Sequence, residues 1–301
     1  MTAADPRETR LGLMAALGAF SVWGLTPIYF KLLGQVAATE IIAHRVVWAV
    51  VVLVIVLALR HREQLLAKLL IGWPTFLALA LSGLLIVINW LIFVHAVNTD
   101  RVLSTSLGYF INPLVSVVMG LLFFRERLTP VQAAAVLIAG AGTLYMAIGV
   151  GQFPWIALGL AFSFALYAVV RKLVDVGPMV GLFWETLLMA PFALVWLIWL
   201  DSQALLSFSQ AGLSQRWLLA GTGLVTVIPL LLFAAGVRRL ALSTIGLMQY
   251  LAPTVTFLLA VFVYAEPFTL SHAVTFGCIW SALILFTWSG WHQRRRTRIP
   301  V

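Results

Sequence analysis

Apolar residues fill the chain in long segments, and charged residues gather in the short stretches between them. Each segment holds about 20 mostly apolar residues, enough for a helix that crosses a hydrocarbon core of about 30 Å. The pattern predicts ten transmembrane helices, at residues 11–33, 39–60, 73–97, 102–124, 130–149, 154–172, 180–200, 217–237, 241–264 and 270–291. The 301 residues are 62% hydrophobic and 10% charged, whereas soluble domains have about 25% charged residues. We therefore predict an all-α polytopic membrane protein.

Basic residues concentrate at alternate ends of these segments. The chain has 19 Lys and Arg residues and a net charge of +9, and 15 of the 19 lie near one face if the N-terminus is cytoplasmic. Because cytoplasmic loops are enriched in Lys and Arg, both termini are predicted to be cytoplasmic. The charge therefore reflects topology, and we expect membrane lipid but no nucleic acid as a partner. Residues 292–301 are interpreted as a basic cytoplasmic tail.

The two halves of the chain resemble each other at an offset of 140 residues. Between 83–129 and 223–269, twelve of 47 aligned positions are identical without a gap. Two five-helix repeats, 11–149 and 154–291, follow from this offset. Because five is odd, the second repeat enters the membrane from the opposite side, which is the inverted arrangement of many transporters. The matches least expected in so apolar a chain are Pro113/Pro253, Glu126/Glu266 and Thr129/Thr269.

The prolines Pro113 and Pro253 fall at matching places in the fourth and ninth predicted spans. Proline within a helix removes a backbone hydrogen bond and kinks the helix. The two residues are therefore candidate hinges, and simple packing kinks are the alternative. The small residues at 139–142 permit close helix contact, either within the chain or in a homodimer.

Five stretches resemble the RarD-type permeases of the EamA branch of the drug/metabolite transporter superfamily. They are FSVWGLTPIYFKLL at 20–33, EIIAHRVVW at 40–48, NWLIFVHAVN at 89–98, LSTSLGYFINPL at 103–114 and ERLTPVQ at 126–132. The resemblance implies two inverted five-helix repeats, a bacterial inner membrane and transport of a small metabolite, amino acid or drug. It also implies that spans 1–4 and 6–9 line a central cavity. The family name is linked to chloramphenicol sensitivity, which does not identify a substrate, a direction or a coupling ion.

Arg45 and Glu185 are charged residues inside predicted spans, and the 140-residue offset aligns them. Each lies roughly 9 Å from opposite membrane faces at 1.5 Å per residue, which leaves about 12 Å between them and predicts no direct salt bridge. A charge that faced lipid would cost several kcal/mol, so both should face the interior, a hydrated path or an opposite charge. A role in binding substrate or holding a gate competes with structural pairing, for example of Arg45 with Glu266. His44 and Glu185 are candidates for proton coupling.

Polar and aromatic residues at membrane depth form a second set of candidates. Aromatic walls with a few amides suit a small amphipathic ligand, and hydrogen bonding between helices is the alternative. The candidate cavity-lining residues are Trp23, Trp48, Asn89, Trp90, His95, Tyr109, Asn112, Trp184, Gln249 and Tyr250.

Several other classes of protein are disfavoured by the sequence. The chain has ten Asp and Glu residues and lacks paired-carboxylate, HExxH and GxSxG motifs, so an intramembrane enzyme is not expected. Without a GxxxxGK[ST] loop, the chain alone does not use ATP directly. The single Cys278 excludes a disulfide within the chain, and we expect no metal or cofactor. A passive channel stays as the alternative to a secondary transporter that exports a small solute by alternating access.

Overall fold

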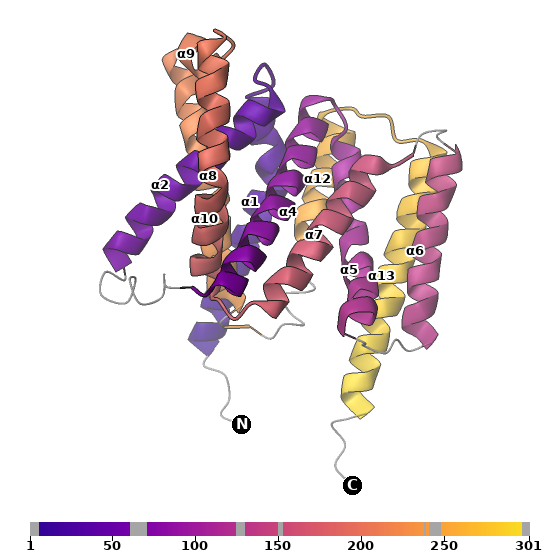
Figure 1. Cartoon of the computed structure of the whole chain (residues 1–301). Coiled ribbons are helices and arrows are strands. Elements are labelled where there is room, and N and C mark those ends of the chain that lie inside the picture. The colour runs from indigo at the N-terminus through magenta and orange to yellow at the C-terminus, as the bar shows by residue number, and fades with distance from the viewer. Residues whose placement is uncertain are drawn as a thin grey trace.

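The computed structural model describes residues 6–60, 71–124, 130–149, 153–237, 239–240 and 248–296. All regular elements in these residues are helices, as predicted. Figure 1 shows the long helices running up and down the molecule, with the start of α1 and the end of α13 on the same side. The helices are α1 Pro6–Lys31, α2 Ala38–Arg60, α4 Trp73–Asn98, α5 Val102–Phe124, α6 Pro130–Gly149, α7 Trp155–Leu173, α8 Pro178–Ser202, α9 Ser207–Gln210, α10 Leu213–Val237, α12 Leu251–Leu258 and α13 Leu270–Arg296, with a π-helical turn, η1, at Leu259–Val263.

Within the described residues, seven helices are long and apolar enough to cross a membrane. They are α1, α2, α4, α5, α7, α8 and α10, and each overlaps a span predicted from the sequence. Shorter apolar helices cover Pro130–Met146, Leu251–Val263 and Leu270–Leu285, within three further predicted spans. The first part of the ninth span, 241–247, lies outside the described residues. The helix α13 continues through Arg296, so residues 292–296 of the predicted basic tail are helical.

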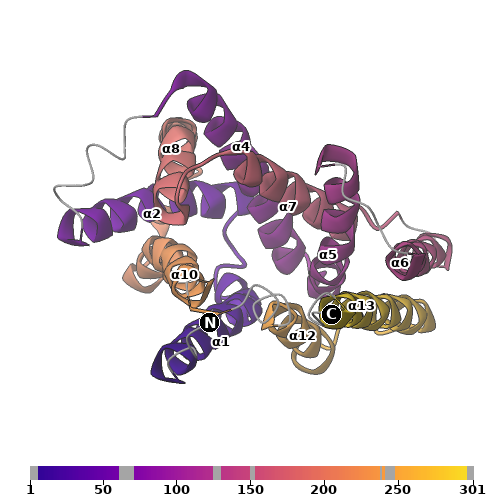
Figure 2. The ribbon, with the colours of Figure 1, turned by 90° about the horizontal axis from the view of Figure 1, so that it is seen from below.

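Helices from the two halves of the chain pack mainly on each other. The first-half helices α1 and α2 both pack on α10, while α4 and α5 both pack on α7. Contacts between α2 and α8, between α4 and α8 and between α12 and α1 join the halves further. Figure 2 shows α6 and α13 beside each other at one edge of the molecule, next to α5. The core is therefore shared between the halves.

Two equivalent glycines lie at close helix crossings. A Cβ on Gly223 of α10 would lie 2.5 Å from the carbonyl carbon of Trp48 in α2. A Cβ on Gly83 of α4 would lie 2.9 Å from the carbonyl oxygen of Glu185 in α8. Small residues at helix interfaces let backbones approach closely in membranes. The two glycines are 140 residues apart, so they occupy equivalent places in the two halves.

Candidate functional site

Arg45 on α2 is buried where four helices meet. Its side chain is 6% exposed, and its Nε donates a hydrogen bond of 2.8 Å to the hydroxyl of Thr226 on α10. The guanidinium carbon lies 4.0 Å from the ring centre of Trp90 on α4 and 5.7 Å from that of Phe30 on α1. A guanidinium over an aromatic face is attracted by the ring quadrupole. Arg45, Thr226, Trp90 and Phe30 are called the Arg45 cluster below.

Asn89 and Tyr109 extend this polar region toward α7 and α5. The Asn89 amide donates bonds of 2.9 Å to the carbonyl oxygen of Leu160 and to the hydroxyl of Ser163, both on α7. The Tyr109 hydroxyl lies 3.5 Å from the Asn89 side-chain oxygen, and its ring centre is 6.0 Å from that of Phe93. Asn89 thus makes the hydrogen bonds between helices that the sequence left as an alternative. The Asn89 side-chain oxygen lies on the side of Tyr109.

Glu185 on α8, the repeat equivalent of Arg45, has partners on two helices, α4 and α7. Its carboxylate lies 3.5 Å from Nε of Arg171 and accepts a bond of 2.7 Å from the Ser82 hydroxyl. The Tyr167 hydroxyl donates a longer bond of 3.4 Å. The Glu185 side chain is fully buried, so the pair with Arg171 neutralises a charge that lipid or a dry core could not solvate. As predicted, Glu185 does not pair with Arg45.

Glu266 does not pair with Arg45, so that structural alternative is wrong. Its two carboxylate oxygens accept hydrogen bonds of 2.6 and 2.8 Å from the backbone N–H groups of Val102 and Leu103, at the start of α5. The first N–H groups of a helix lack partners within the helix and carry its positive dipole end, so an acidic group is stabilised there. Burial raises the pKa of the Glu266 carboxyl above its usual range, although these N–H groups favour the charged form.

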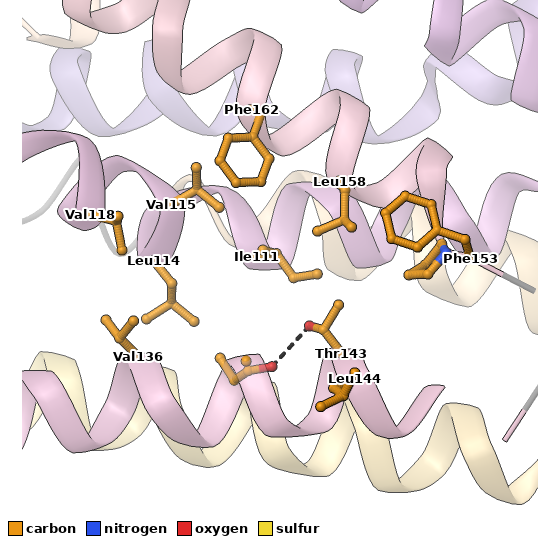
Figure 3. Close-up of a pocket in the computed structure, with 13 residues that line it drawn as sticks. Ile111, Leu114, Val115, Val118, Val136, Thr143, Leu144, Phe153, Leu158 and Phe162 are labelled. Atoms are coloured by element: carbon orange, nitrogen blue, oxygen red, sulfur yellow. Dashed lines mark hydrogen bonds between the residues drawn. The ribbon is translucent and has the colours of Figure 1, made fainter. Parts of the chain in front are cut away.

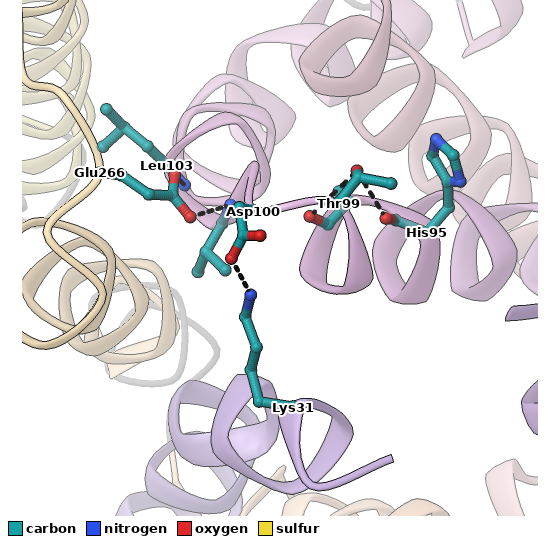
Figure 4. Close-up of polar contacts among 8 residues, drawn as sticks. Lys31, His95, Thr99, Asp100, Leu103 and Glu266 are labelled. Carbon is teal, nitrogen blue, oxygen red and sulfur yellow. Dashed lines mark hydrogen bonds and ion pairs between the residues drawn. The ribbon is translucent and has the colours of Figure 1, made fainter. Parts of the chain in front are cut away.

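Lys31 and Asp100 form an ion pair beside this capped helix end (Figure 4). Lys31 is the last residue of α1, and its Nζ also lies 5.3 Å from the ring centre of Tyr264. Asp100 has φ of 56°, and Arg101 N–H donates to the Ala96 carbonyl at 2.8 Å, which is a Schellman ending of α4. The left-handed turn thus points the Asp100 carboxylate at α1.

His44 lies on the same helix as Arg45 but belongs to a different contact. Its Nε2 is 3.8 Å from the Glu40 carboxylate, and its ring centre is 4.9 Å from that of Phe208. Glu40 accepts hydrogen bonds from the N–H groups of Ser207 and Phe208, at 3.1 and 3.0 Å. His44 therefore packs where Glu40 anchors the short helix α9, away from the Arg45 cluster.

The remaining predicted site residues are divided among several contacts. Trp23 packs with Phe20 and Phe233 between α1 and α10, and Trp48 lies against Gly223. Trp184 meets Phe76 of α4 edge to face, and Tyr250 stacks on Phe110 of α5. These aromatic residues line helix crossings rather than one common surface.

Three predicted polar residues do not join the cluster. His95 is exposed and lies 5.8 Å from the Trp155 ring, pointing away from Asp100 in Figure 4. Gln249 is exposed, and the Asn112 side-chain oxygen lies 3.4 Å from the Ser116 hydroxyl of its own helix.

The two candidate hinge prolines occupy different helical positions. Pro113 lies within α5, which is assigned as one continuous helix from Val102 to Phe124. Pro253 is the third residue of α12. In a first turn the missing N–H has no intrahelical partner to lose, so proline is tolerated there without a kink.

Sequence reasoning missed several contact residues of the two buried charges. Thr226 and Ser82 lie in apolar segments, where a Ser or Thr hydroxyl normally bonds to its own helix backbone, and Tyr167 is an aromatic residue in such a segment. One signal was available for Arg171, because the repeat offset aligns it with Lys31. Both cations pair with an acid, and the ends of α1 and α7 that carry them lie on opposite sides of the molecule (Figure 1).

An apolar groove of about 320 Å³ lies between α5, α6 and α7 (Figure 3). Its wall includes Ile111, Leu114, Leu158 and Phe162, and the hydroxyl of Thr143 is bonded to the Ala139 carbonyl at 2.9 Å. The groove contains no ionisable side chain, so its wall offers little to recognise a polar solute. Within the described residues, no group of three or more His, Cys, Asp and Glu residues is arranged to hold a metal ion.

Long apolar helices that bury an arginine, amides and hydroxyls between them define a polytopic membrane protein with a polar interior. The chain belongs to the EamA-like transporter family, which matches residues 10–148 and 154–288. It is 42% identical to the protein RarD of Escherichia coli, over 97% of this chain and 99% of that one. An uncharacterized transporter of Vibrio cholerae is 41% identical over 98% of both chains.

A solved crystal structure shares the fold, with a TM-score of 0.61 and 19% sequence identity over 92% of this chain and 96% of that one. The resemblance to the RarD-type permeases is thus confirmed, and the protein is a multi-pass transporter and not an enzyme.

Proposed function

We propose that this protein is a secondary transporter of the bacterial inner membrane that exports a small amphipathic solute by alternating access. In this proposal ten transmembrane helices form two inverted five-helix repeats, and both termini are cytoplasmic. The solute binds between the repeats, in a path that opens to one face at a time. This path includes the region of Asn89, Tyr109 and the Arg45 cluster.

The symmetry of the helix contacts carries this proposal. The repeat pairs each helix of one half with one of the other: α1 with α7, α2 with α8, α4 with α10, α5 with α12, and α6 with α13. When each helix is exchanged with its equivalent, the α5–α7 contact becomes α12–α1, α4–α7 becomes α10–α1, and α2–α10 becomes α8–α4. All of these contacts are present. The contacts α2–α8, α5–α12 and α6–α13 exchange into themselves. A twofold relation between two inverted repeats has this signature, and such repeats place the substrate site at their interface.

The ionic contacts on the two opposite sides of the molecule supply the gates in this proposal. Lys31 with Asp100 ties α1 to the α4–α5 turn, whereas Arg171 with Glu185 ties α7 to α8 at the opposite end (Figure 1). Lys31 and Arg171 are repeat equivalents. Alternating access then requires one contact to hold while the other opens. His44 and Glu185 are the groups proposed for proton coupling, and release of Arg171 would free Glu185 to take a proton.

Counterflow in proteoliposomes tests carriage. Vesicles with purified protein are loaded with an excess of unlabelled amino acid, aromatic metabolite or chloramphenicol, and the same labelled solute is added outside. A carrier gives a transient, saturable overshoot of labelled solute. Equilibration without an overshoot indicates a channel, and a changed solute indicates an enzyme.

Access can be tested without knowing the solute. A Tyr109→Cys variant in a Cys278→Ser background is labelled with a membrane-impermeant maleimide in right-side-out and inside-out vesicles. We expect labelling from both sides, and linking Lys31→Cys to Asp100→Cys with a bismaleimide should abolish labelling from the outer side alone. Leu137→Cys, on a side chain that is 73% exposed on α6, is the lipid-facing control. Labelling of Tyr109→Cys from neither side contradicts a hydrated path.

A further inference from the structure

Arg45 is a buried cation with unused hydrogen-bonding capacity. Among the described residues its one hydrogen bond runs from Nε to Thr226, and no acidic side chain forms an ion pair with it. A guanidinium has five N–H donors, so the two terminal nitrogens keep their fork free. A buried charge without an opposite charge is costly. A ligand that brings the missing negative charge would remove this cost.

The repeat shows that this imbalance is specific to the first half. In the second half Arg171 and Glu185 form a buried ion pair. The equivalent residues of the first half are Lys31 and Arg45, both cations. Lys31 pairs with Asp100, so Arg45 holds the charge that is left over. The same repeat position is thus Glu185, an acid with an ion partner, in the second half and Arg45, a cation without one among the described residues, in the first half.

The surroundings of Arg45 also restrict the rest of the ligand. Trp90 holds the guanidinium over its ring face, and Thr226 fixes its Nε edge. A planar fork fixed in this way matches the two oxygens of a carboxylate better than a point charge does. Phe30 and Phe93, with ring centres 6.1 Å apart, provide an apolar wall beside it.

The acids of the region are already engaged. Glu185 is bound to Arg171 and Glu266 to the start of α5, so neither faces Arg45 as a partner for a second, positive group. The site therefore suits a ligand with a net negative charge better than a zwitterion.

We propose that the transported solute is an organic monocarboxylate with an apolar body, and that the free fork of Arg45 binds its carboxylate. This inference rests on the proposed transport function and names its substrate class. It assigns Arg45 as a substrate-binding residue and Trp90 and Thr226 as the residues that position it. A neutral solute would leave the guanidinium uncompensated, so such a solute should be a poor substrate.

Charge-selective modification tests the site directly. Thr226→Cys is introduced in a Cys278→Ser background, and its rates of reaction with anionic sulfonatoethyl and cationic trimethylammonium-ethyl methanethiosulfonate are compared in vesicles of both orientations. A positive charge within a few ångströms speeds the reaction with the anionic reagent and slows the reaction with the cationic one. Adding Arg45→Gln should therefore lower the anion-to-cation rate ratio at least about tenfold. Thr256→Cys on α12, whose hydroxyl contacts the Gly24 carbonyl, is the matched control and should show no such dependence on Arg45.

Competition identifies the chemical group. Excess phenylacetate should slow the modification of Thr226→Cys, whereas its neutral isostere phenylacetamide should not. An Arg45→Lys variant keeps the charge but loses the fork, so it should keep the rate ratio and lose protection by phenylacetate. Only variants that elute as single peaks on size exclusion are compared.

Each outcome decides a different claim. If Thr226→Cys is modified but its anion-to-cation rate ratio does not depend on Arg45, the proposed anion site is wrong, while the proposed transport path stands. Equal protection by phenylacetate and phenylacetamide, or none by phenylacetate, overturns the carboxylate assignment. No modification from either membrane face contradicts both this inference and a hydrated path at Thr226. The counterflow overshoot tests the proposed transport function independently of Arg45.

Discussion

Replacing Gly223 with alanine perturbs the tight crossing of α10 over α2. The added Cβ would lie 2.5 and 2.6 Å from the carbonyl carbon and oxygen of Trp48, and 2.8 Å from its Cβ. Backbone atoms cannot rotate away as a side-chain tip can, so the two helices must separate. Overpacking of this kind costs about 1–3 kcal/mol, and alanine returns up to about 1 kcal/mol in helix propensity. We expect a net loss of about 1–2 kcal/mol in the free energy of unfolding.

The assay is thermal unfolding in detergent micelles, followed by far-ultraviolet circular dichroism. Gly83→Ala, the repeat equivalent, should also lower the midpoint, because its Cβ would lie 2.9 Å from the Glu185 carbonyl oxygen. Gly140→Ala is the control, since a Cβ there has no other atom within 4 Å, and this variant should be as stable as the wild type or more so. If Gly223→Ala and Gly140→Ala unfold at the same temperature, the close-crossing argument is refuted.

Three further predictions concern the polar contacts at the ends of the helices. Arg171→Gln leaves the buried Glu185 without its ion partner and should destabilise the protein by about 3–5 kcal/mol, while the double variant with Glu185→Gln should recover much of this loss in thermal unfolding. Glu266→Gln should weaken the cap of α5 by about 1 kcal/mol, measured as faster amide hydrogen exchange at the start of that helix. Asp100→Gly should change the free energy of unfolding little, because glycine favours the left-handed turn, whereas Asp100→Val should lower it by about 1–2 kcal/mol, seen as a lower thermal midpoint.

The hydrophobic pattern could predict the helices but not their partners. A bilayer requires every backbone polar group to bond internally, so an apolar segment of about 20 residues has few alternatives to a helix. Almost every face of these helices is apolar, and a pattern without a polar face does not say which face meets which neighbour. The crossings at Gly83 and Gly223 needed coordinates, although the repeat had already aligned these glycines.

For the candidate site too, the sequence could predict which residue is buried but not which residues it contacts. Burial of Arg45 could be predicted from the cost of a charge in lipid, and the structure leaves its side chain 6% exposed. The partners could not be predicted, because the same cost applies to every arrangement that shields the charge. Thr226 lies 181 residues from Arg45, and a threonine among apolar residues carries no mark of the contact it makes. His95 shows the converse, since a polar residue near a helix end can face outward at little cost and is no guide to the interior.

The gates proposed for the two ends of the path differ in strength. The pair proposed as the outer gate joins Lys31 to Asp100, whose side chain is 76% exposed, whereas the pair proposed as the inner gate buries Glu185 completely against Arg171. An exposed pair contributes about 1 kcal/mol or less, because water competes with it. Separating a buried pair costs more, because each desolvated charge loses its partner and water does not replace it. Without solute, the outer end should therefore open more readily. Tyr109→Cys should react faster in right-side-out vesicles, and replacing both Arg171 and Glu185 with glutamine should shift the reaction toward inside-out vesicles. Equal rates before and after that double substitution would show that the inner ion pair does not set which face is open.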